Sequence, residues 1–228
     1  RLCLINAACF FIPLAFSFYH KDGQTYLLIF HIAGLALLGL PSVFLKSQPS
    51  ELSIRDGFLT VSLAWICLAT FGSMPFVISG SIPSFTNAFF ETMSGFTTTG
   101  ASILTDVEIL PKSLQIWRHM TQWLGGMGII ALAVAVFPFL GVGGVQLFKA
   151  EVPGPTKDKI SPRISKTAKI LWSIYLLLTI IQVLLLIIGG LSFFDATCIT
   201  FATMATGGFA PLNASVAGYL SLYIQYVI

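Results

Sequence analysis

Two short segments rich in threonine and glycine have the residue types needed to hold a cation with oxygen atoms. Residues 97–101 read TTTGA, and residues 205–209 read ATGGF. Glycine adopts positive φ at no steric cost, so such a segment can turn successive backbone carbonyls toward one axis. Rings of carbonyl oxygens replace the hydration shell of K⁺, and threonine hydroxyls can add ligands or brace the loop. Neither segment contains a charged side chain, so we expect a permeant cation to be held by neutral oxygen atoms.

The two segments occupy matching positions in an internal repeat. Taken alone, a Thr/Gly segment is typical of an ordinary loop or a helix kink. Here residues 84–88 (SFTNA) align without gaps with residues 192–196 (SFFDA), 108 positions later, and the same offset pairs the two segments. Duplication in matched surroundings favours the functional interpretation over the ordinary loop. The candidate ion-binding residues are Thr98, Thr99, Gly100, Thr206, Gly207 and Gly208.

Two acidic residues lie in the short apolar stretches that precede these segments. A carboxylate inside a membrane is costly and usually functional. Asp195 stands near the start of a predicted helix, where an N-terminal cap that complements the helix dipole is the preferred interpretation. For Glu91 two alternatives stay open, bracing of the following loop or attraction of cations to an outer mouth.

The elements that position these residues must be membrane helices. The chain is 56% hydrophobic and only 9% charged, whereas a soluble domain carries about 25% charged residues. Because a spanning helix needs about 20 apolar residues, the apolar runs predict an all-α polytopic membrane protein. Spans are expected at 2–19, 25–45, 57–78, 119–148 and 170–194, with short helices at 84–96 and 192–205. The final run, 219–228, is too short to span, and we expect the chain to be part of a longer protein.

The basic residues predict the orientation. Six of the twelve Lys and Arg residues are Lys149, Lys157, Lys159, Arg163, Lys166 and Lys169. The positive-inside rule places this loop, residues 149–169, in the cytoplasm. The count of spans is consistent with that placement only if the short helices at 84–96 and 192–205 enter and leave on the outer side.

Several other classes of function are disfavoured by the same sequence. The net charge of +3 is too small to indicate a nucleic-acid partner. The four cysteines lie in apolar stretches and are interpreted as packing residues. The chain has no HExxH or GxSxG motif and its three histidines are scattered, so an enzyme is not expected. An ion-coupled secondary transporter of K⁺ or Na⁺ is the main alternative, although the repeats of such proteins are often inverted and these run in the same direction.

Three motifs resemble the Trk/Ktr/HKT superfamily of potassium uptake proteins. Residues 89–102 (FFETMSGFTTTGAS) resemble its first pore loop, and residues 122–129 (QWLGGMGI) its following helix. Residues 202–211 (ATMATGGFAP) resemble the second pore loop. The resemblance implies a pore of four helix–pore loop–helix repeats with one filter glycine from each, here Gly100 and Gly208. Sodium-selective plant relatives carry Ser at the first position, so Gly100 favours K⁺.

The resemblance also implies a division of the chain and a set of partners. Residues 1–45 would form two extra helices typical of the Trk branch, 57–148 the first pore repeat, and 170–228 an incomplete second repeat. The protein would lie in a cell membrane, the bacterial inner membrane by this resemblance, as a homodimer of full-length protomers surrounded by lipid. It would bind a cytoplasmic nucleotide-binding regulatory subunit and use no organic cofactor, K⁺ being its permeant ion.

Overall fold

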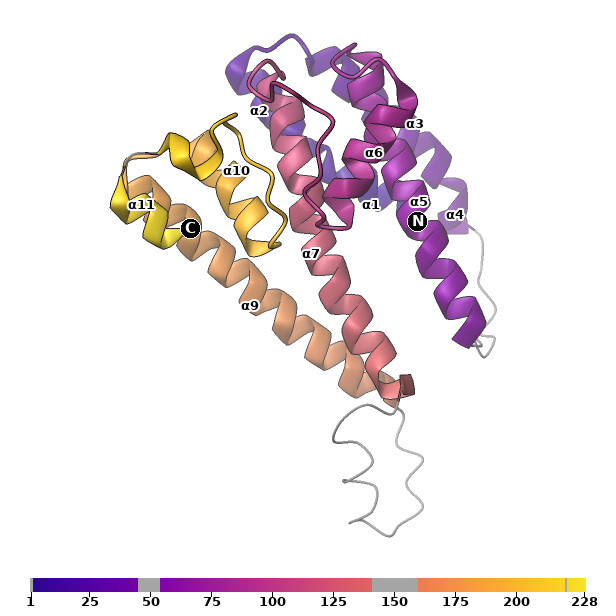
Figure 1. The fold of residues 1–228 in the computed structure, drawn as a ribbon. Coiled ribbons are helices and arrows are strands. Elements are labelled where there is room, and N and C mark those ends of the chain that lie inside the picture. The colour runs from indigo at the N-terminus through magenta and orange to yellow at the C-terminus, as the bar shows by residue number, and fades with distance from the viewer. Residues whose placement is uncertain (1, 45–53, 141–159, 220) are drawn as a thin grey trace.

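The computed structural model describes residues 2–44, 54–140, 160–219 and 221–228, and every regular element in these ranges is a helix (Figure 1). This confirms the predicted all-α class. The helices are α1 (Leu2–Cys9), α2 (Phe11–His20), α3 (Thr25–Gly39), α4 (Pro41–Phe44), α5 (Ile54–Ile78), α6 (Phe85–Phe96), α7 (Lys112–Leu140), α9 (Ile160–Ile188), α10 (Phe193–Met204), the 3₁₀ helix η1 (Ser215–Gly218) and α11 (Leu222–Val227).

Four stretches in the described part of the chain are long and apolar enough to cross a membrane. They are Leu2–His20, Thr25–Phe44, Phe58–Ile78 and Lys166–Ile188. The outer face of α9 carries exposed large apolar side chains, which a bilayer accommodates and water does not. These four candidate spans coincide with four of the five spans expected from the apolar runs.

Proline interrupts the first two spans. Pro13 has no N–H to donate to Cys9, four residues earlier, and the helix breaks at Phe10 between α1 and α2. Pro41 follows Leu40 in the same way, and α4 starts there as a separate short helix. Each of the first two expected spans therefore consists of two consecutive helices, α1 and α2 in the first and α3 and α4 in the second.

Two helices begin earlier than the charge-free runs predicted. The helix α7 begins at Lys112, before Arg118, and is 29 residues long, about 43 Å at the usual rise per residue. A search for uncharged runs started this span too late because the charge of Arg118 is neutralised inside the protein, as described below; residues 141–148 of the expected span lie outside the described ranges. The helix α9 begins at Ile160, so its first residues lie within the stretch 149–169 that was expected to be a loop; residues 149–159 of that stretch lie outside the described ranges.

The two short helices occupy the positions that the repeat requires. The bounds of α6 and α10 differ by 108 residues at both ends. In Figure 1, α6 and α10 run inward from one end of the bundle, and the chain after each returns to that same end. This arrangement agrees with the expectation that both helices enter and leave on one side.

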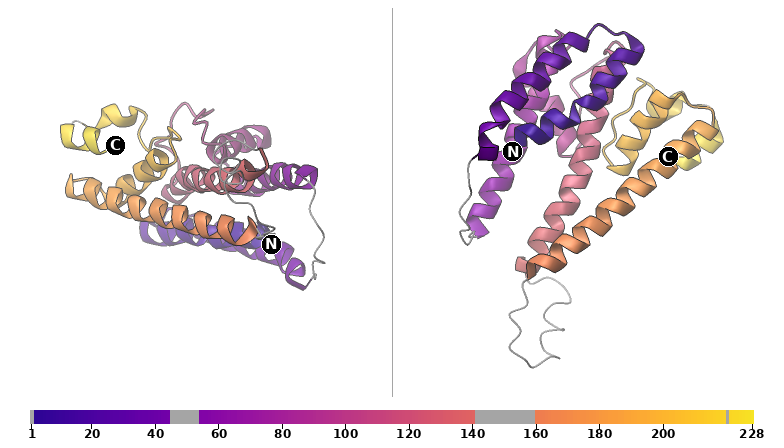
Figure 2. Two further views of the ribbon diagram at one scale, coloured as in Figure 1. Left: turned by 90° about the horizontal axis from the view of Figure 1, so that it is seen from below. Right: turned by 180° about the vertical axis from the view of Figure 1, so that it is seen from behind.

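The helix α7 lies at the centre of the structure. It packs against α6, α10, α2 and α9, and Figure 2 shows it between the N-terminal helices and the α9–α10 pair. Phe10, between α1 and α2, stacks on Trp117 of α7 with a centroid distance of 3.8 Å, and both rings are fully buried. The Trp117 indole N–H donates to the Gly72 carbonyl of α5 at 2.8 Å. Trp117 therefore ties the N-terminal helices and α5 to the central helix.

Three glycines of α7 let neighbouring segments approach its backbone. A Cβ at Gly125 would overlap the Phe96 carbonyl oxygen at the end of α6. At Gly126 it would lie 3.0 Å from the Ala205 α-carbon, and at Gly128 2.8 Å from the Trp65 ring. Gly125 and Gly126 thus bring the ends of both short helices against α7, and Gly128 lets Trp65 of α5 approach it.

Candidate ion-binding site

The first Thr/Gly segment begins as the C-terminal cap of α6. The Thr98 N–H donates to the Gly95 carbonyl at 2.9 Å, and the Thr99 N–H donates to the Ser94 carbonyl at 3.0 Å. These two bonds form a Schellman motif around the capping residue Thr97. The chain therefore leaves the helix sharply at Thr98, with the negative end of the helix dipole directed at the segment.

The second segment repeats this cap bond for bond. The Thr206 N–H donates to the Thr203 carbonyl at 2.9 Å, and the Gly207 N–H donates to the Ala202 carbonyl at 2.8 Å. Each donor and acceptor is displaced by 108 residues from its counterpart in the first segment. The repeat therefore extends from sequence to backbone hydrogen bonding.

Each segment has positive φ at two residues separated by one. The φ angles are 54° at Thr98 and 75° at Gly100, and 52° at Thr206 and 83° at Gly208. Glycine adopts this conformation freely, but a β-branched threonine is strained there by about 1–2 kcal/mol. Two threonines held in the same unfavourable conformation indicate that the backbone shape itself is required.

Backbone carbonyls of both segments are available to a ligand. Within the described ranges, no hydrogen bond uses the carbonyl oxygens of Thr98, Thr99, Gly100, Thr206 or Gly208. Thr99, Thr206 and Gly208 are exposed, and Thr98 and Gly100 are half-buried, so protein donors do not enclose these carbonyls. These oxygens are therefore the groups that can replace the water ligands of a cation.

The two segments lie against each other. A Cβ at Gly100 would overlap the Gly207 carbonyl oxygen, so only glycine fits at this contact. That oxygen accepts a hydrogen bond from the Gln122 amide of α7 at 2.7 Å, and the Gln122 oxygen accepts the Phe209 N–H at 3.2 Å. The structure thus brings the predicted residues Gly100 and Gly207 together and holds them through Gln122.

Glu91 braces the chain that follows the first segment. Its Oε1 accepts from the Ser102 hydroxyl at 2.8 Å, and its Oε2 accepts from the Ile103 N–H at 2.9 Å. The Arg118 Nε lies 2.7 Å from Oε1, and both charged side chains are buried. Of the two alternatives for Glu91, the structure favours bracing, because the carboxylate faces protein donors and is 1% exposed. The need to neutralise a buried carboxylate is the signal by which Arg118 could have been predicted.

Asp195 lies in the first turn of α10 and is hydrogen-bonded to the N-cap residue, Ser192. The Ser192 hydroxyl caps the helix by accepting the Asp195 N–H at 3.1 Å, and it donates to the Asp195 carboxylate at 2.7 Å. The cap of α10 is therefore Ser192 and not Asp195, whose carboxylate in the first turn complements the helix dipole. The equivalent Ser84 caps α6, where Asn87 takes the place of Asp195.

Other polar side chains of α7 hold the chain beyond the second segment. The Gln115 amide donates to the Pro211 carbonyl at 2.7 Å. The Arg118 guanidinium donates to the Ala210 carbonyl at 3.4 Å and lies 3.6 Å from the centre of the Phe209 ring. Arg118 thus contacts the surroundings of both segments. Sequence reasoning missed both glutamines: Gln122 was visible as an amide within an expected apolar span, whereas Gln115 lies before the start of that span at residue 119.

The loops that follow the two Thr/Gly segments are joined through Asn213. Its side chain accepts the Val107 N–H at 2.8 Å and donates to Asp106 at 2.7 Å, and its N–H donates to Glu108 at 2.9 Å. Hydrogen bonds from Asn213 and from the Glu108 backbone lower the pKa of Asp106. Asp106 and Glu108 therefore accept hydrogen bonds that connect the two loops.

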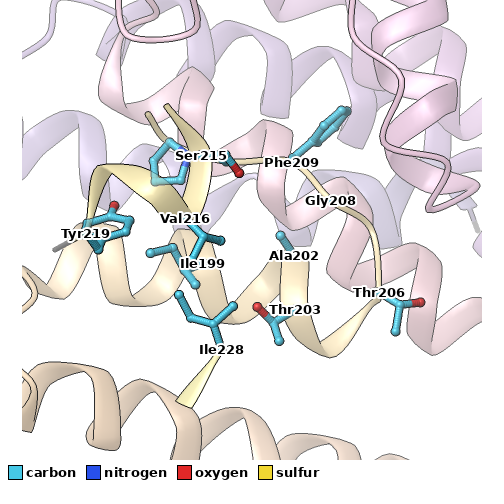
Figure 3. Close-up of a pocket in the computed structure, with 12 residues that line it drawn as sticks. Ile199, Ala202, Thr203, Thr206, Gly208, Phe209, Ser215, Val216, Tyr219 and Ile228 are labelled. Carbon is cyan, nitrogen blue, oxygen red and sulfur yellow. The ribbon is translucent and has the colours of Figure 1, made fainter. Parts of the chain in front are cut away.

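A pocket of about 330 Å³ flanks the second segment on the side of η1 and the C-terminal residues (Figure 3). Figure 3 labels Thr206 and Gly208 on its edge, with Ile199, Val216 and Ile228 among its apolar lining. No charged side chain lines it. Because its lining includes Thr206 and Gly208, the pocket borders the second Thr/Gly segment and is not separate from the candidate site.

Comparison with known protein families matches this chain to a family of cation transport proteins. The family described as "TrkH: Cation transport protein" matches residues 27–228. The Trk system potassium uptake protein TrkH of Escherichia coli (strain K12) is 43% identical over 235 residues, which cover 100% of this chain and 48% of that protein. TrkH of Vibrio parahaemolyticus is 50% identical over 180 residues, covering 78% of this chain and 37% of that protein.

A solved structure has the same fold. The crystal structure of the potassium transporter TrkH from Vibrio parahaemolyticus superposes with a TM-score of 0.84 at 37% identity, over 99% of this chain and 45% of that one. The chain spans about half the length of the relatives that it matches. The family is one of transporters, not enzymes. With its candidate spans, its short paired helices and a match over nearly its whole length, this chain is a multi-pass membrane protein that belongs to the TrkH family of cation transport proteins.

Proposed function

We propose that this chain supplies two loops of a selectivity filter through which K⁺ is taken up into the cell. One observation carries the proposal: both Thr/Gly segments have the same pair of positive-φ residues, Thr98 and Gly100 in the first and Thr206 and Gly208 in the second. Within the described ranges, no hydrogen bond uses the carbonyl oxygens of these four residues. Such oxygens suit a weakly hydrated monovalent cation, since they carry no net charge to trap it. The potassium uptake named for the relatives supports the choice of ion.

Within the proposed filter the six residues have different tasks. Carbonyls of Thr98, Thr99, Gly100, Thr206 and Gly208 serve as ion ligands. The Gly207 carbonyl is already bonded to Gln122, so Gly207 serves the filter by its shape and its contact with Gly100. The helices α6 and α10 are pore helices whose negative ends face the ion.

The remaining filter ligands would come from two further repeats in the longer protein. The relatives are about twice as long as this chain, which supports that division. We propose that the complete protein works as a homodimer in the bacterial inner membrane. A cytoplasmic nucleotide-binding subunit would regulate it, contacting the basic stretch 149–169, and no organic cofactor is needed.

The proposal is tested by ion flux through the complete gene product in liposomes, with wild type beside Gly100→Ser. We expect K⁺ to be preferred over Na⁺ by the wild type and the preference to fall in the variant, because the side chain meets the Gly207 carbonyl. Unchanged selectivity in the variant would remove Gly100 from the ion path. Absence of downhill flux of either ion would instead support an ion-coupled transporter of K⁺ or Na⁺.

A further inference from the structure

We propose that Gln122 is a positioning residue that sets the cation selectivity of the second Thr/Gly segment by fixing the backbone on both sides of Gly208. The inference rests on the proposed function. Gln122 belongs to α7, in the first repeat, and acts on the loop of the second repeat. Gln122 is not itself an ion ligand. It acts on selectivity through the two peptide groups that flank Gly208, by its bonds to the Gly207 carbonyl and the Phe209 N–H.

The carboxamide of Gln122 holds one acceptor and one donor of the loop. Its nitrogen donates to the Gly207 carbonyl at 2.7 Å, and its oxygen accepts the Phe209 N–H at 3.2 Å. Only one orientation of the amide satisfies a carbonyl and an N–H together, so the contact is directional. The Gln122 side chain is 0% exposed, and water therefore does not compete for either bond.

Gly208 lies between the two residues that Gln122 holds. Its φ is 83°, it is exposed, and a Cβ there would have no atom within 4 Å. On the opposite side of the loop, a Cβ at Gly207 would overlap the Gln122 amide carbon. The loop is therefore packed on Gln122 on one face and open on the other. Rotation of the Gly208 peptide groups requires both bonds to Gln122 to break.

The chain contains a matched control for this role. Gln115 lies about two turns earlier on the same helix, is also 0% exposed, and also holds loop carbonyls, those of Pro211 at 2.7 Å and Val107 at 3.3 Å. Both of these carbonyls lie outside the Thr/Gly segments. Loss of the Gln115 amide therefore measures the effect of removing a buried glutamine on stability, without a change in the Thr/Gly segments.

The experiment compares Gln122→Met with Gln115→Met in the complete gene product, reconstituted in liposomes. Methionine keeps the length and flexibility of the side chain and removes the amide. We expect Gln122→Met to lower the K⁺/Na⁺ flux ratio by about tenfold, which corresponds to about 1.4 kcal/mol of discrimination. We expect Gln115→Met to leave the ratio unchanged, while the apparent melting temperature in detergent falls for both variants.

Two results would overturn the inference while the proposed function stands: an unchanged ratio in Gln122→Met, or an equal loss of selectivity in Gln115→Met. If Gln122→Met does not fold, Gly207→Ala presses on the same carboxamide from the loop side, and an unchanged ratio there overturns the inference as well. A wild type without any preference for K⁺ would contradict the proposed function itself, and this inference with it.

Discussion

Arg118 and Glu91 form a buried ion pair, with the arginine Nε 2.7 Å from the carboxylate Oε1. The pair joins the short helix before the first Thr/Gly segment to the long helix after it. The carboxylate also holds Ser102 and Ile103, and the guanidinium also holds Ala210 in the second repeat. One pair of charges therefore connects the surroundings of both segments.

Removal of one partner of this pair should destabilise the protein strongly. Glu91→Met or Arg118→Met leaves the other charge buried without compensation, which costs about 3–5 kcal/mol in comparable sites. The double variant Glu91→Met/Arg118→Met removes both charges and should be more stable than either single variant. The apparent melting temperature of the purified protein in detergent measures this, as a double-mutant cycle.

The exposed Lys169 on α9 provides the control for that cycle, and Lys169→Gln should leave the melting temperature nearly unchanged. Strictly additive losses in the double variant would contradict the pairing, since independent sites add and coupled sites do not.

Three glycines with similar φ should respond differently to alanine. Gly23, Gly100 and Gly208 have φ of 79°, 75° and 83°, so alanine costs each about 1 kcal/mol or more from backbone strain alone. Only at Gly100 does the new methyl meet an atom, the Gly207 carbonyl oxygen, while Gly23 and Gly208 have open space. Gly100→Ala should therefore lower the melting temperature most, and thermal unfolding of the three variants tests the order.

Gly23 lies in the loop between α2 and α3, far along the chain from either segment, and isolates the cost of backbone strain. Gly23→Ala should leave ion selectivity unchanged, whereas Gly208→Ala should reduce it with a comparable loss of stability. Equal melting temperatures for Gly23→Ala and Gly100→Ala would show that contact between the new methyl group and the Gly207 carbonyl does not lower stability.

Asp22 should make stability depend on pH in the acid range. Partial burial acts to raise its pKa, but hydrogen bonds from Ser113, Ser17 and Gln24 outweigh burial, and the pKa is lowered from 3.8. The Ser113 N–H belongs to the first turn of α7, where a carboxylate also complements the helix dipole. A lowered pKa stabilises the folded state above the unfolded pKa, and this contribution disappears as the pH falls through the folded pKa.

Asp22→Asn should accordingly lower the melting temperature at pH 7 and flatten its decline below about pH 4. Melting curves of wild type and variant between neutral and acid pH provide the measurement. Parallel curves for the two proteins would show that Asp22 does not titrate with folding.

The apolar runs and the 108-residue repeat were enough to predict the spans, the short helices and the positions of the two segments. These features depend on local properties, because a bilayer demands about 20 apolar residues per helix and a repeat copies its own pattern. The position of Asp195 in the first turn of α10 was predictable for the same reason, whereas the cap itself is Ser192, three residues earlier. Proline breaks at Phe10 and Leu40 and the early start of α7 were not predicted from hydropathy.

What the sequence by itself determined is the set of membrane helices and the two loops that carry threonine and glycine. Tertiary structure decided how the loops are held: Arg118 pairs with Glu91 across 27 positions, and Gln122 reaches Gly207 across 85. Such contacts depend on which faces of α6, α7 and the second loop meet, and no local pattern encodes that. The ligands of a carbonyl site are backbone atoms, so their positions depend on how the loop backbone is held. Here Arg118 and Gln122, which are distant in sequence, hold it.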